Sequence, residues 1–462
     1  AADSSTTAGT VAVIPADEAA PLLKRFRSSL GEHLLVVPHS RIFDLSGDLA
    51  AAERECEGTG RHASDLLEAL AATLALPSEG EVPLDHVVQP PPQSISLNVS
   101  SSCNLSCSYC YAARGSFGGA QPDAMTWEVA RAAIDGLLDA ADPQAPVTVG
   151  FLGGEPFVNR RLVHRAVEYA AAEGKRRGLS VGFSVTTNGT LLSAEDIELL
   201  RLHRFAVTVS VDGGAELQNR QRPLPVHAGG SYARLREATA PLLAAPGRAK
   251  IAARATVTRS DFNLRERFEA ILSMGFPEVG FAPLRAAPHD AGALRDEDWP
   301  GYLDAVIRAA EPELERACEG GTVRLTNFAV ALKQIHRGAS SPYPCGAGGG
   351  YFSVSARGAW YACHRAVGSE PYRLGDSTGI EPARQREFLV ARHVHAQAAC
   401  RQCWARYLCS GGCHQEASHR NDSACGFIRG WLEFCLAAYC ELGERNPDFF
   451  NPEQGAPREE YT

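Results

Sequence analysis

Three cysteines stand close together in one short stretch of the chain, Cys103, Cys107 and Cys110, in the spacing C-x3-C-x2-C. Residues 94–99 before them alternate apolar and polar side chains, which predicts a strand, and Ser101 helps to end it. The cysteines are therefore expected on a loop. Three thiolates on one loop can bind three irons of a cubane cluster, which normally takes four cysteines. The missing fourth leaves one iron open to a substrate or cosubstrate.

The C-x3-C spacing, with an aromatic residue (Tyr109) just before the third cysteine, resembles the signature of radical S-adenosylmethionine (SAM) enzymes. The resemblance implies a 4Fe–4S cluster whose open iron binds the amino and carboxylate groups of SAM. It also implies that one electron from the cluster releases a 5′-deoxyadenosyl radical. Taken alone, the three cysteines leave a zinc loop or structural thiols as the alternative.

The composition indicates a globular protein. The chain has 462 residues, 45% of them hydrophobic, and a net charge of −9, which argues against nucleic acid or an anionic membrane as the main partner. No apolar run approaches a membrane span. The start of the chain lacks an apolar signal core, and ten of the 14 cysteines fall into two groups, as in metal binding. These features predict a cytoplasmic protein.

Strands and helices alternate from residue 94 to about residue 310. The predicted strands cover residues 94–99, 147–152, 180–186, 206–211, 251–258 and 278–283. The predicted helices cover residues 126–141, 160–178, 194–203, 232–245 and 264–274. Such alternation predicts an α/β fold with a parallel sheet and right-handed crossovers. Six units are too few for a closed eight-stranded barrel, and they match the partial (β/α)6 barrel that the resemblance implies.

Four regions are expected along the chain. Residues 1–88 form a small N-terminal α+β module, with two short strands in residues 33–45 and helices in residues 50–75; it is similar to winged-helix-like domains that bind leader peptides. A Pro-rich linker leads into the partial barrel at residues 89–315. Residues 316–444 form a loop-rich domain that ends in a helix over residues 426–444, and residues 445–462 form a polar tail.

Polar residues at the carboxyl ends of the predicted strands face the active site in such folds. The sequence Gly153-Gly154-Glu155-Pro156 follows the second strand. By resemblance, this motif holds the amino group of SAM. The further candidates for contacts to the ribose and the methionine carboxylate of SAM are Asn188, Ser210, Asp212, Arg222 and Arg254, and Tyr109 is expected near the adenine. Asn188-Gly189 and Asp212-Gly213 are equally compatible with turns.

A second group of cysteines resembles the SPASM domain of radical SAM peptide maturases. Its members are Cys345, Cys363, Cys400, Cys403, Cys409, Cys413 and Cys425. The resemblance implies two auxiliary Fe–S clusters: Cys345, Cys363 and Cys413 hold the first, and the other four hold the second. Some relatives have a further cysteine where this chain has Tyr351. The first auxiliary cluster is therefore expected to have three protein ligands and an iron open to a substrate thiolate.

Three reactions on a peptide or small protein are compatible with this pattern: thioether formation from a cysteine, a carbon–carbon or aromatic crosslink, and oxidation of Ser or Cys to formylglycine. Anaerobic sulfatase maturases resemble one another in an Asp after the cysteine matching Cys363, whereas this chain has His364. The sequence Cys363-His364-Arg365 and residues 372–376 and 403–409 resemble the thioether-forming maturases of quinohaemoprotein amine dehydrogenase. Thioether formation is therefore favoured, with His364 and Asp212 as candidate bases.

The expected partners are a substrate peptide with a leader and a reductant of flavodoxin or ferredoxin type. Two alternatives without catalysis are also compatible with the cysteine pattern: a multi-cluster electron carrier, and a scaffold that only binds a leader peptide. A carrier needs no SAM pocket, so the Gly-Gly-Glu-Pro motif and the barrel argue against it. Reductive cleavage of SAM would distinguish the enzyme from both.

Overall fold

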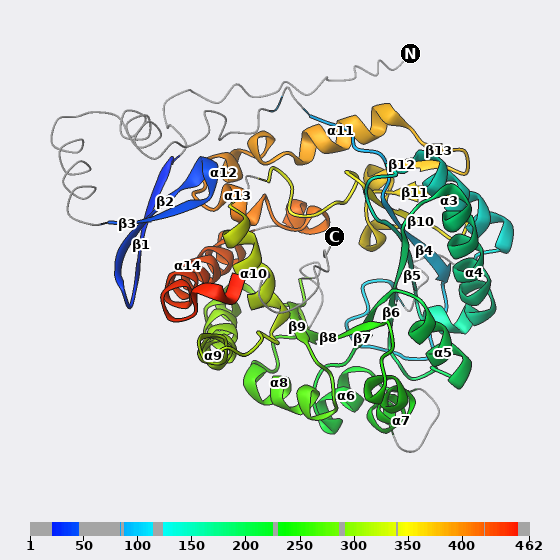
Figure 1. Cartoon of the computed structure of the whole chain (residues 1–462), viewed down its shortest axis with the longest axis horizontal. Coiled ribbons are helices and arrows are strands. Elements are labelled where there is room, and N and C mark those ends of the chain that lie inside the picture. Colours follow the sequence, from blue (N-terminus) through cyan, green and yellow to red (C-terminus); the bar gives the residue numbers. More distant parts are fainter. Residues whose placement is uncertain are drawn as a thin grey trace, which may run out of the picture.

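The computed structural model describes residues 21–45, 84, 87–113, 123–224, 230–285, 292–338, 341–419 and 421–450. Its centre is a ten-stranded sheet in the order β13-β12-β11-β10-β4-β5-β6-β7-β8-β9. Strands β4 to β9 are all parallel. Their bounds are β4 Ser94–Ser100, β5 Val147–Gly153, β6 Val181–Thr187, β7 Phe205–Ser210, β8 Lys250–Val257 and β9 Val279–Pro283. All six predicted strands are present, and the sheet curves into an open barrel (Figure 1).

Helices cover the outside of the curved sheet (Figure 1). They are α3 Trp127–Ala140, α4 Arg160–Arg177, α5 Ala194–Leu202, α6 Ala215–Gln221, α7 Gly230–Ala244 and α8 Leu264–Ser273. The apolar face expected for the first of them is buried, with Ile134 and Leu137 fully enclosed. The (β/α)6 prediction is therefore confirmed, with one difference: two helices, α6 and α7, connect β7 to β8, where the sequence pattern predicted one.

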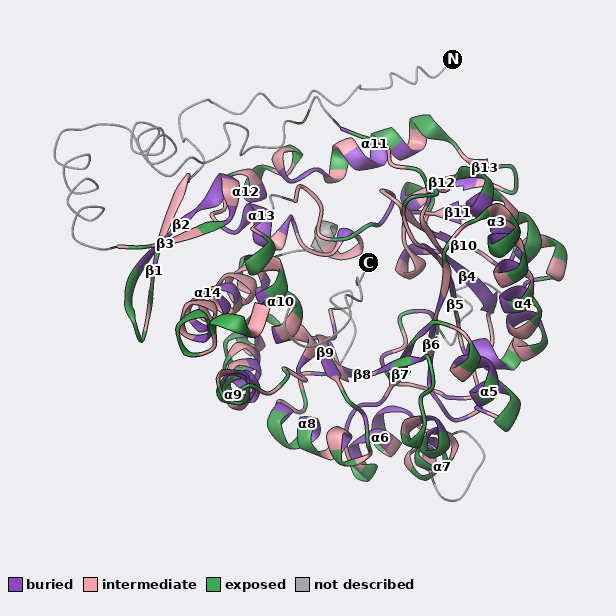
Figure 2. Ribbon diagram, in the orientation of Figure 1, coloured by how far each residue is buried: buried purple, intermediate pink, exposed green. Residues whose placement is uncertain are grey.

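Side-chain alternation explains how the strands are placed. In β8, residues Ile251, Ala253, Ala255 and Val257 are buried, and the residues between them are at least partly accessible. Period-2 alternation puts one face of the strand against the helices and the other face toward the inside of the barrel. Figure 2 shows the same contrast between the buried strands and the exposed outer faces of the helices.

The C-terminal part extends the sheet beyond β4, and its elements complete the ring seen in Figure 1. Helices α9 Trp299–Cys318 and α10 Thr326–Arg337 follow β9, and α9 crosses the predicted boundary at residue 315. Strand β10 Tyr351–Val354 then pairs in parallel with β4, a pairing that the sequence did not predict. Strands β11 Trp360–Tyr361, β12 Arg373–Asp376 and β13 Gly379–Ile380 extend it. Helices α11 Pro382–Arg392, α12 Ala398–Arg401, α13 Arg406–Cys409 and α14 Asp422–Arg445 complete the region.

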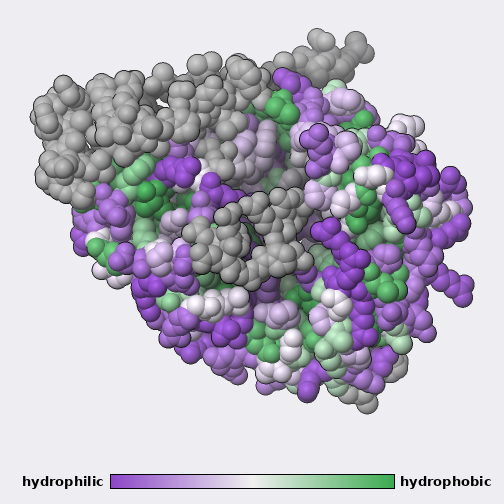
Figure 3. Space-filling view, viewed as in Figure 1, coloured by the Kyte–Doolittle hydropathy of each residue, from purple (hydrophilic) through white to green (hydrophobic). Residues whose placement is uncertain are grey.

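The N-terminal module contains three antiparallel strands, one more than predicted: β1 Leu23–Ser28, β2 Gly31–Val36 and β3 Arg41–Asp44. The helices predicted in residues 50–75 lie outside the described residues. The small sheet packs on α14, and Lys24 pairs with Glu433 at 2.6 Å. No helix in the described part of the chain is long and apolar enough to cross a membrane. Much of the face drawn in Figure 3 is hydrophilic.

Candidate active site

The loop after β4 brings the first three cysteines together at the carboxyl edge of the barrel. Burial raises the pKa values of Cys103 and Cys107, to about 11 for Cys107, and the neighbouring thiols add to both shifts. The loop is tied to the end of α6, because the amide of Ser108 donates to the carbonyl of Gln221 at 3.1 Å. Thiolates that are costly to bury unpaired require a compensating positive charge, which iron supplies. This donor set fits a cluster.

Two predicted SAM contacts lie directly on this loop. The side-chain amide of Asn188, the residue that follows β6, donates to Cys103 Sγ at 3.7 Å and to Asn104 Oδ1 at 2.9 Å. Arg222 Nη1 lies 3.9 Å from Cys107 Sγ. The structure therefore brings both side chains to the thiols: Asn188 from the end of a strand, as the strand-end rule predicts, and Arg222 from the end of α6. Their contacts with SAM itself stay predictions.

The Gly-Gly-Glu-Pro motif fastens the strand ends to one another. The amide of Gly154 donates to Ser100 O at 2.7 Å. Glu155 is fully buried and accepts hydrogen bonds from the Thr187 hydroxyl at 2.7 Å and from the backbone amide of Asn188 at 2.7 Å. Burial raises the pKa of Glu155 to about 7, opposed by these hydrogen bonds. Since the carboxylate already has these partners, its position supports the β6 end that carries Asn188, and Pro156 continues the motif as the first residue of a 3-10 turn.

We expect Gly153→Ala to destabilise the fold. Gly153 has φ +147°, and a Cβ atom there would lie 2.3 Å from Ser100 O. Strain and the clash with backbone together should cost at least about 3 kcal/mol in the free energy of unfolding. Denaturant unfolding checks this, with Gly214→Ala as control, because a Cβ atom at Gly214 meets nothing within 4 Å. Equal losses for the two variants would contradict the prediction.

Asp212 links the cysteine loop to the end of α6 and to β8. Its fully buried carboxylate accepts hydrogen bonds from Arg222 at 3.0 and 3.2 Å, from the Tyr109 hydroxyl and from the Thr256 amide at 2.9 Å. Burial strongly raises the pKa of Tyr109, which favours the neutral phenol as the donor. These contacts give Asp212 a positioning role, and its action as a base stays a prediction.

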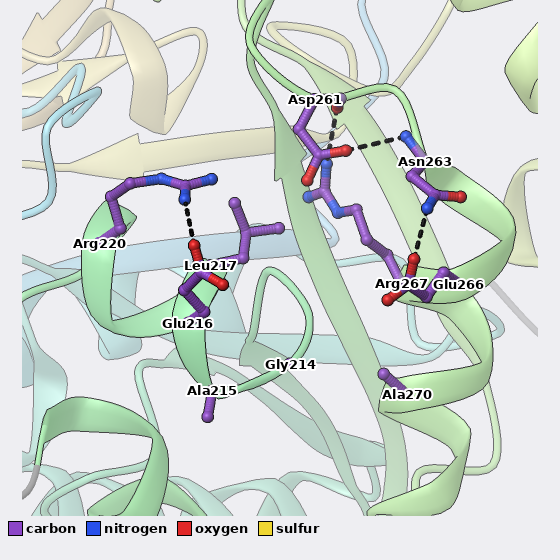
Figure 4. Close-up of a pocket in the computed structure, with 10 residues that line it drawn as sticks. All are labelled: Gly214, Ala215, Glu216, Leu217, Arg220, Asp261, Asn263, Glu266, Arg267 and Ala270. Atoms are coloured by element: carbon purple, nitrogen blue, oxygen red, sulfur yellow. Dashed lines mark hydrogen bonds and ion pairs between the residues drawn. The ribbon is translucent and has the colours of Figure 1, made fainter.

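Arg267 holds the backbone of Asp212 in place. Its guanidinium donates to the backbone oxygens of Asp212 and Thr256, each at 2.7 Å, and to that of Asp261 at 3.3 Å. Arg267 also lines a pocket of about 310 Å³ between α6 and α8, drawn in Figure 4 with the exposed pair of Glu216 and Arg220. This pocket lies on the outer side of Asp212, and none of the predicted site residues lines it.

Asp212→Asn should destabilise the protein, because it leaves the buried guanidinium of Arg222 without its counter-charge. Removing one partner of a buried ion pair typically costs about 3 kcal/mol or more. Denaturant unfolding measures the loss. Glu216→Gln is the control, since its side chain is 92% exposed in its pair with Arg220 and exposed pairs contribute little. An unfolding curve of Asp212→Asn like that of wild type would refute the role given to Asp212.

The second cysteine group also converges. Burial raises the pKa values of Cys345 and Cys363, to about 11 for Cys363, and neighbouring thiols, Cys413 among them, add to both shifts. Arg365 lies beside them: its amide donates to Cys363 Sγ at 3.4 Å, and its Nη1 lies 3.7 Å from Cys413 Sγ. The three residues predicted for the first auxiliary cluster are therefore neighbours. Within the described residues, no group of three or more His, Cys, Asp or Glu side chains is placed to hold a single metal ion.

The four cysteines predicted for the second auxiliary cluster lie on consecutive elements near the end of the chain. Cys400 is in α12, Cys409 ends α13, and Cys425 is in the first turn of α14. The amide of Cys403 donates to Cys400 O at 3.0 Å. Their role as ligands stays a prediction.

A hydrogen-bonded row separates the two thiol groups. The Tyr351 hydroxyl contacts Ser96 Oγ at 2.6 Å and His364 Nδ1 at 2.8 Å. The His364 ring stands edge-on to that of Tyr111, with 6.5 Å between centroids. Burial lowers the pKa of His364 to about 4, and Arg365 adds to the shift. The predicted base His364 thus lies between the SAM loop and the auxiliary thiols.

The sequence did not single out Tyr111, Arg285 or Glu416. Glu416 accepts from Arg365 at 2.5 Å and from Arg285 at 3.0 Å, so two arginines share one carboxylate. The only sequence signal was the proximity of Tyr111 to Cys110 and of Glu416 to Cys413. Of the remaining predicted SAM contacts, Ser210 ends β7 and pairs in register with Arg254 on β8.

These observations define a class: a partial α/β barrel with a three-thiol loop at its carboxyl edge and a second thiol group opposite. Residues 97–243 match the family model of the radical SAM superfamily. A serine-type anaerobic sulfatase-maturating enzyme of Klebsiella aerogenes is 24% identical over 355 residues, 72% of this chain and 82% of the relative. A cysteine-type enzyme of Clostridium perfringens is 24% identical over 375 residues, 76% of this chain and 98% of the relative.

Among solved structures, anSMEcpe with bound AdoMet is similar, with a TM-score of 0.65 and 20% identity over 76% of this chain and 100% of the other. At this identity the likeness shows the fold. The chain carries a radical SAM domain and is an enzyme. The domain implies a 4Fe–4S cluster and SAM, for which Cys103, Cys107 and Cys110 provide a fitting donor set.

Proposed function

We propose that this enzyme modifies a peptide or small protein and forms an intrapeptide thioether between a cysteine sulfur and a carbon. The bound clusters would supply the electron that cleaves SAM and take up the electron that bond formation releases. The substrate carbon loses a hydrogen atom to the 5′-deoxyadenosyl group, and the substrate thiol loses a proton. The net change removes two hydrogens from the peptide. A reductant of flavodoxin or ferredoxin type would deliver the first electron.

The arrangement around Tyr351 is the observation that carries this proposal. Cys345, Cys363 and Cys413 are neighbours, and Tyr351 stands where some relatives have a further cysteine. Its hydroxyl hydrogen-bonds with Ser96 and His364, so we do not expect it to bind iron. A cluster on these three thiols would keep an iron for the substrate thiolate, and thiolates are natural iron ligands.

Tyr351→Cys tests this directly. The new thiol should become a fourth ligand and close the site. In wild-type holoenzyme with saturating SAM, which occupies the other open iron, added 2-mercaptoethanol should change the electron paramagnetic resonance spectrum of the auxiliary cluster. Tyr351→Cys should give no change, and the control Tyr351→Phe should respond like wild type. A wild-type spectrum that is insensitive to the thiol would contradict an open iron.

Formylglycine formation is the second candidate, favoured by the sulfatase-maturating relatives. His364 in place of the carboxylate expected in those enzymes weighs against it. The two products differ chemically: a thioether consumes the thiol without making a carbonyl, whereas formylglycine is an aldehyde that reacts with hydrazides. Mass spectrometry after hydrazide treatment separates them. A carbon–carbon crosslink would leave the substrate thiol free to alkylate.

The N-terminal module would bind the leader of the substrate peptide. What supports this part of the proposal is the separate three-stranded sheet that packs on α14.

A further inference from the structure

Arg365 contacts two of the three cysteines predicted for the first auxiliary cluster. Its backbone amide donates to Cys363 Sγ at 3.4 Å. Its guanidinium reaches the third cysteine of the group, and Nη1 donates to Cys413 Sγ at 3.7 Å. Two N–H donors of one residue are therefore directed at sulfur atoms that two distant segments of the chain contribute. Such donors fit the sulfur ligands of an anionic iron–sulfur cluster better than they fit neutral thiols, which are weak acceptors.

The positive charge of Arg365 is only partly balanced by its neighbours. Glu416 accepts from Arg365 Nη1 at 2.5 Å and from Arg285 Nη1 at 3.0 Å, so two guanidinium groups share one carboxylate. The side chains of Arg365, Arg285 and Glu416 are only 27%, 22% and 14% exposed. Because water screens charges less where protein encloses them, the excess positive charge of these three side chains acts on the thiol group beside them.

The guanidinium beside the first cysteine loop has a different environment. Arg222 Nη1 lies 3.9 Å from Cys107 Sγ, but its guanidinium pairs with the fully buried carboxylate of Asp212 at 3.0 and 3.2 Å. The first loop thus faces a neutral ion pair, whereas the second thiol group faces an arginine whose counter-charge is shared. An iron–sulfur cluster takes up an electron more readily when its surroundings are more positive and its sulfurs accept hydrogen bonds.

We propose that Arg365 raises the reduction potential of the auxiliary cluster on Cys345, Cys363 and Cys413, and so makes it an acceptor for the electron that bond formation releases. This rests on the proposed function, which supplies both the cluster and the electron. When the carbon radical and the thiolate form the thioether, one electron is released, and the oxidised cluster is reduced by that electron. Glu416 has the opposite effect, because its negative charge offsets that of Arg365.

A redox titration of the anaerobically reconstituted holoenzyme, followed by electron paramagnetic resonance, tests this without turnover. The signal of the auxiliary cluster is the one that Cys413→Ala lacks. Arg365→Gln should shift the equilibrium constant for its reduction at least about tenfold toward the oxidised form, which lowers the midpoint potential by about 59 mV for one electron. Glu416→Gln should raise the midpoint potential. Arg365→Lys keeps the charge and should stay closer to wild type than Arg365→Gln.

The two substitutions separate the effect of charge from that of structure, because each breaks the same ion pair. If the pair only held two segments together, both variants would move the midpoint potential in the same direction or leave it unchanged. Arg384→Gln and Glu381→Gln are the matched controls. They break a pair of 3.1 Å at the start of α11, with side chains 41% and 53% exposed, and such exposed pairs contribute little. Both controls should keep the wild-type midpoint potential.

The inference is overturned if Arg365→Gln keeps the wild-type midpoint potential, if it and Glu416→Gln shift the potential in the same direction, or if the control pair shifts it equally. A holoenzyme without any signal that depends on Cys413 would also overturn it, and would remove the auxiliary cluster from the proposed function. Thioether formation fails separately, when a substrate peptide incubated with SAM loses no hydrogens. The measured potentials do not depend on that result, so the two failures are distinguishable.

Discussion

Cys107→Ala should abolish the formation of 5′-deoxyadenosine from SAM. Its thiol is one of three on the loop after β4, beside Arg222 and enclosed by protein. With two thiols left, the loop cannot hold three irons, and the geometry that leaves one iron for SAM is lost. We expect at least about a 100-fold decrease in the rate of cleavage, or more than about 2.7 kcal/mol in activation free energy. Chromatography of the products from dithionite-reduced, anaerobically reconstituted protein measures it.

Cys318→Ala is the matched control for this variant. Cys318 ends α9, outside both thiol groups, and is partly exposed. It should cleave SAM at the wild-type rate and keep the full iron content, whereas Cys107→Ala should lose the iron of one cluster. Retained cleavage in Cys107→Ala would mean that these thiols do not hold the SAM-binding cluster. Zinc in place of iron at residues 103, 107 and 110 would lead to the same conclusion.

The barrel could be predicted from sequence because each of its strands carries a local signal. Residues 94–99 alternate, helical spacing follows in residues 126–141, and this order repeats along the chain. The first thiol group could be predicted for a similar reason, since Cys103, Cys107 and Cys110 lie within eight residues, whereas the second was inferred from its resemblance to a family pattern. Spacing along the chain therefore identified what is local.

The parts that were missed depend on contacts between distant segments. The pairing of β10 with β4 joins residues more than 250 positions apart, and two short apolar segments carry no mark of their partners. The hydrogen bonds of the Glu155 carboxylate with Thr187 and Asn188 were not predicted either, and the contact of its motif with SAM stays a prediction. Glu416 could not be recognised beyond its closeness to Cys413, because it becomes a shared acceptor only when the segment after β9, which carries Arg285, and the C-terminal loops meet. Such roles follow from tertiary placement, which residue type does not encode.

Cys413→Ala should separate SAM cleavage from modification of the peptide. Cys413 lies in the second thiol group, where its partners are Cys345, Cys363 and the guanidinium of Arg365. The contacts that hold the first loop come from Asn188, Arg222 and Asp212, and none of them depends on Cys413. The variant should therefore form 5′-deoxyadenosine within about threefold of the wild-type rate, a change of less than 1 kcal/mol, and yield no crosslinked peptide.

The loss of product has a chemical cause. Bond formation between a carbon radical and a thiolate releases an electron. The proposed acceptor of this electron is the cluster on Cys345, Cys363 and Cys413, which is also the proposed binding site of the substrate thiolate. Without it, hydrogen abstraction goes on and the radical is reduced instead, by one electron from dithionite and one deuteron from the solvent, so deuterium should enter the peptide in place of the crosslink. Cys440→Ala on α14 is the control, because Cys440 belongs to neither thiol group. Normal crosslinking by Cys413→Ala would show that the second thiol group transfers electrons at most and does not hold the substrate thiolate.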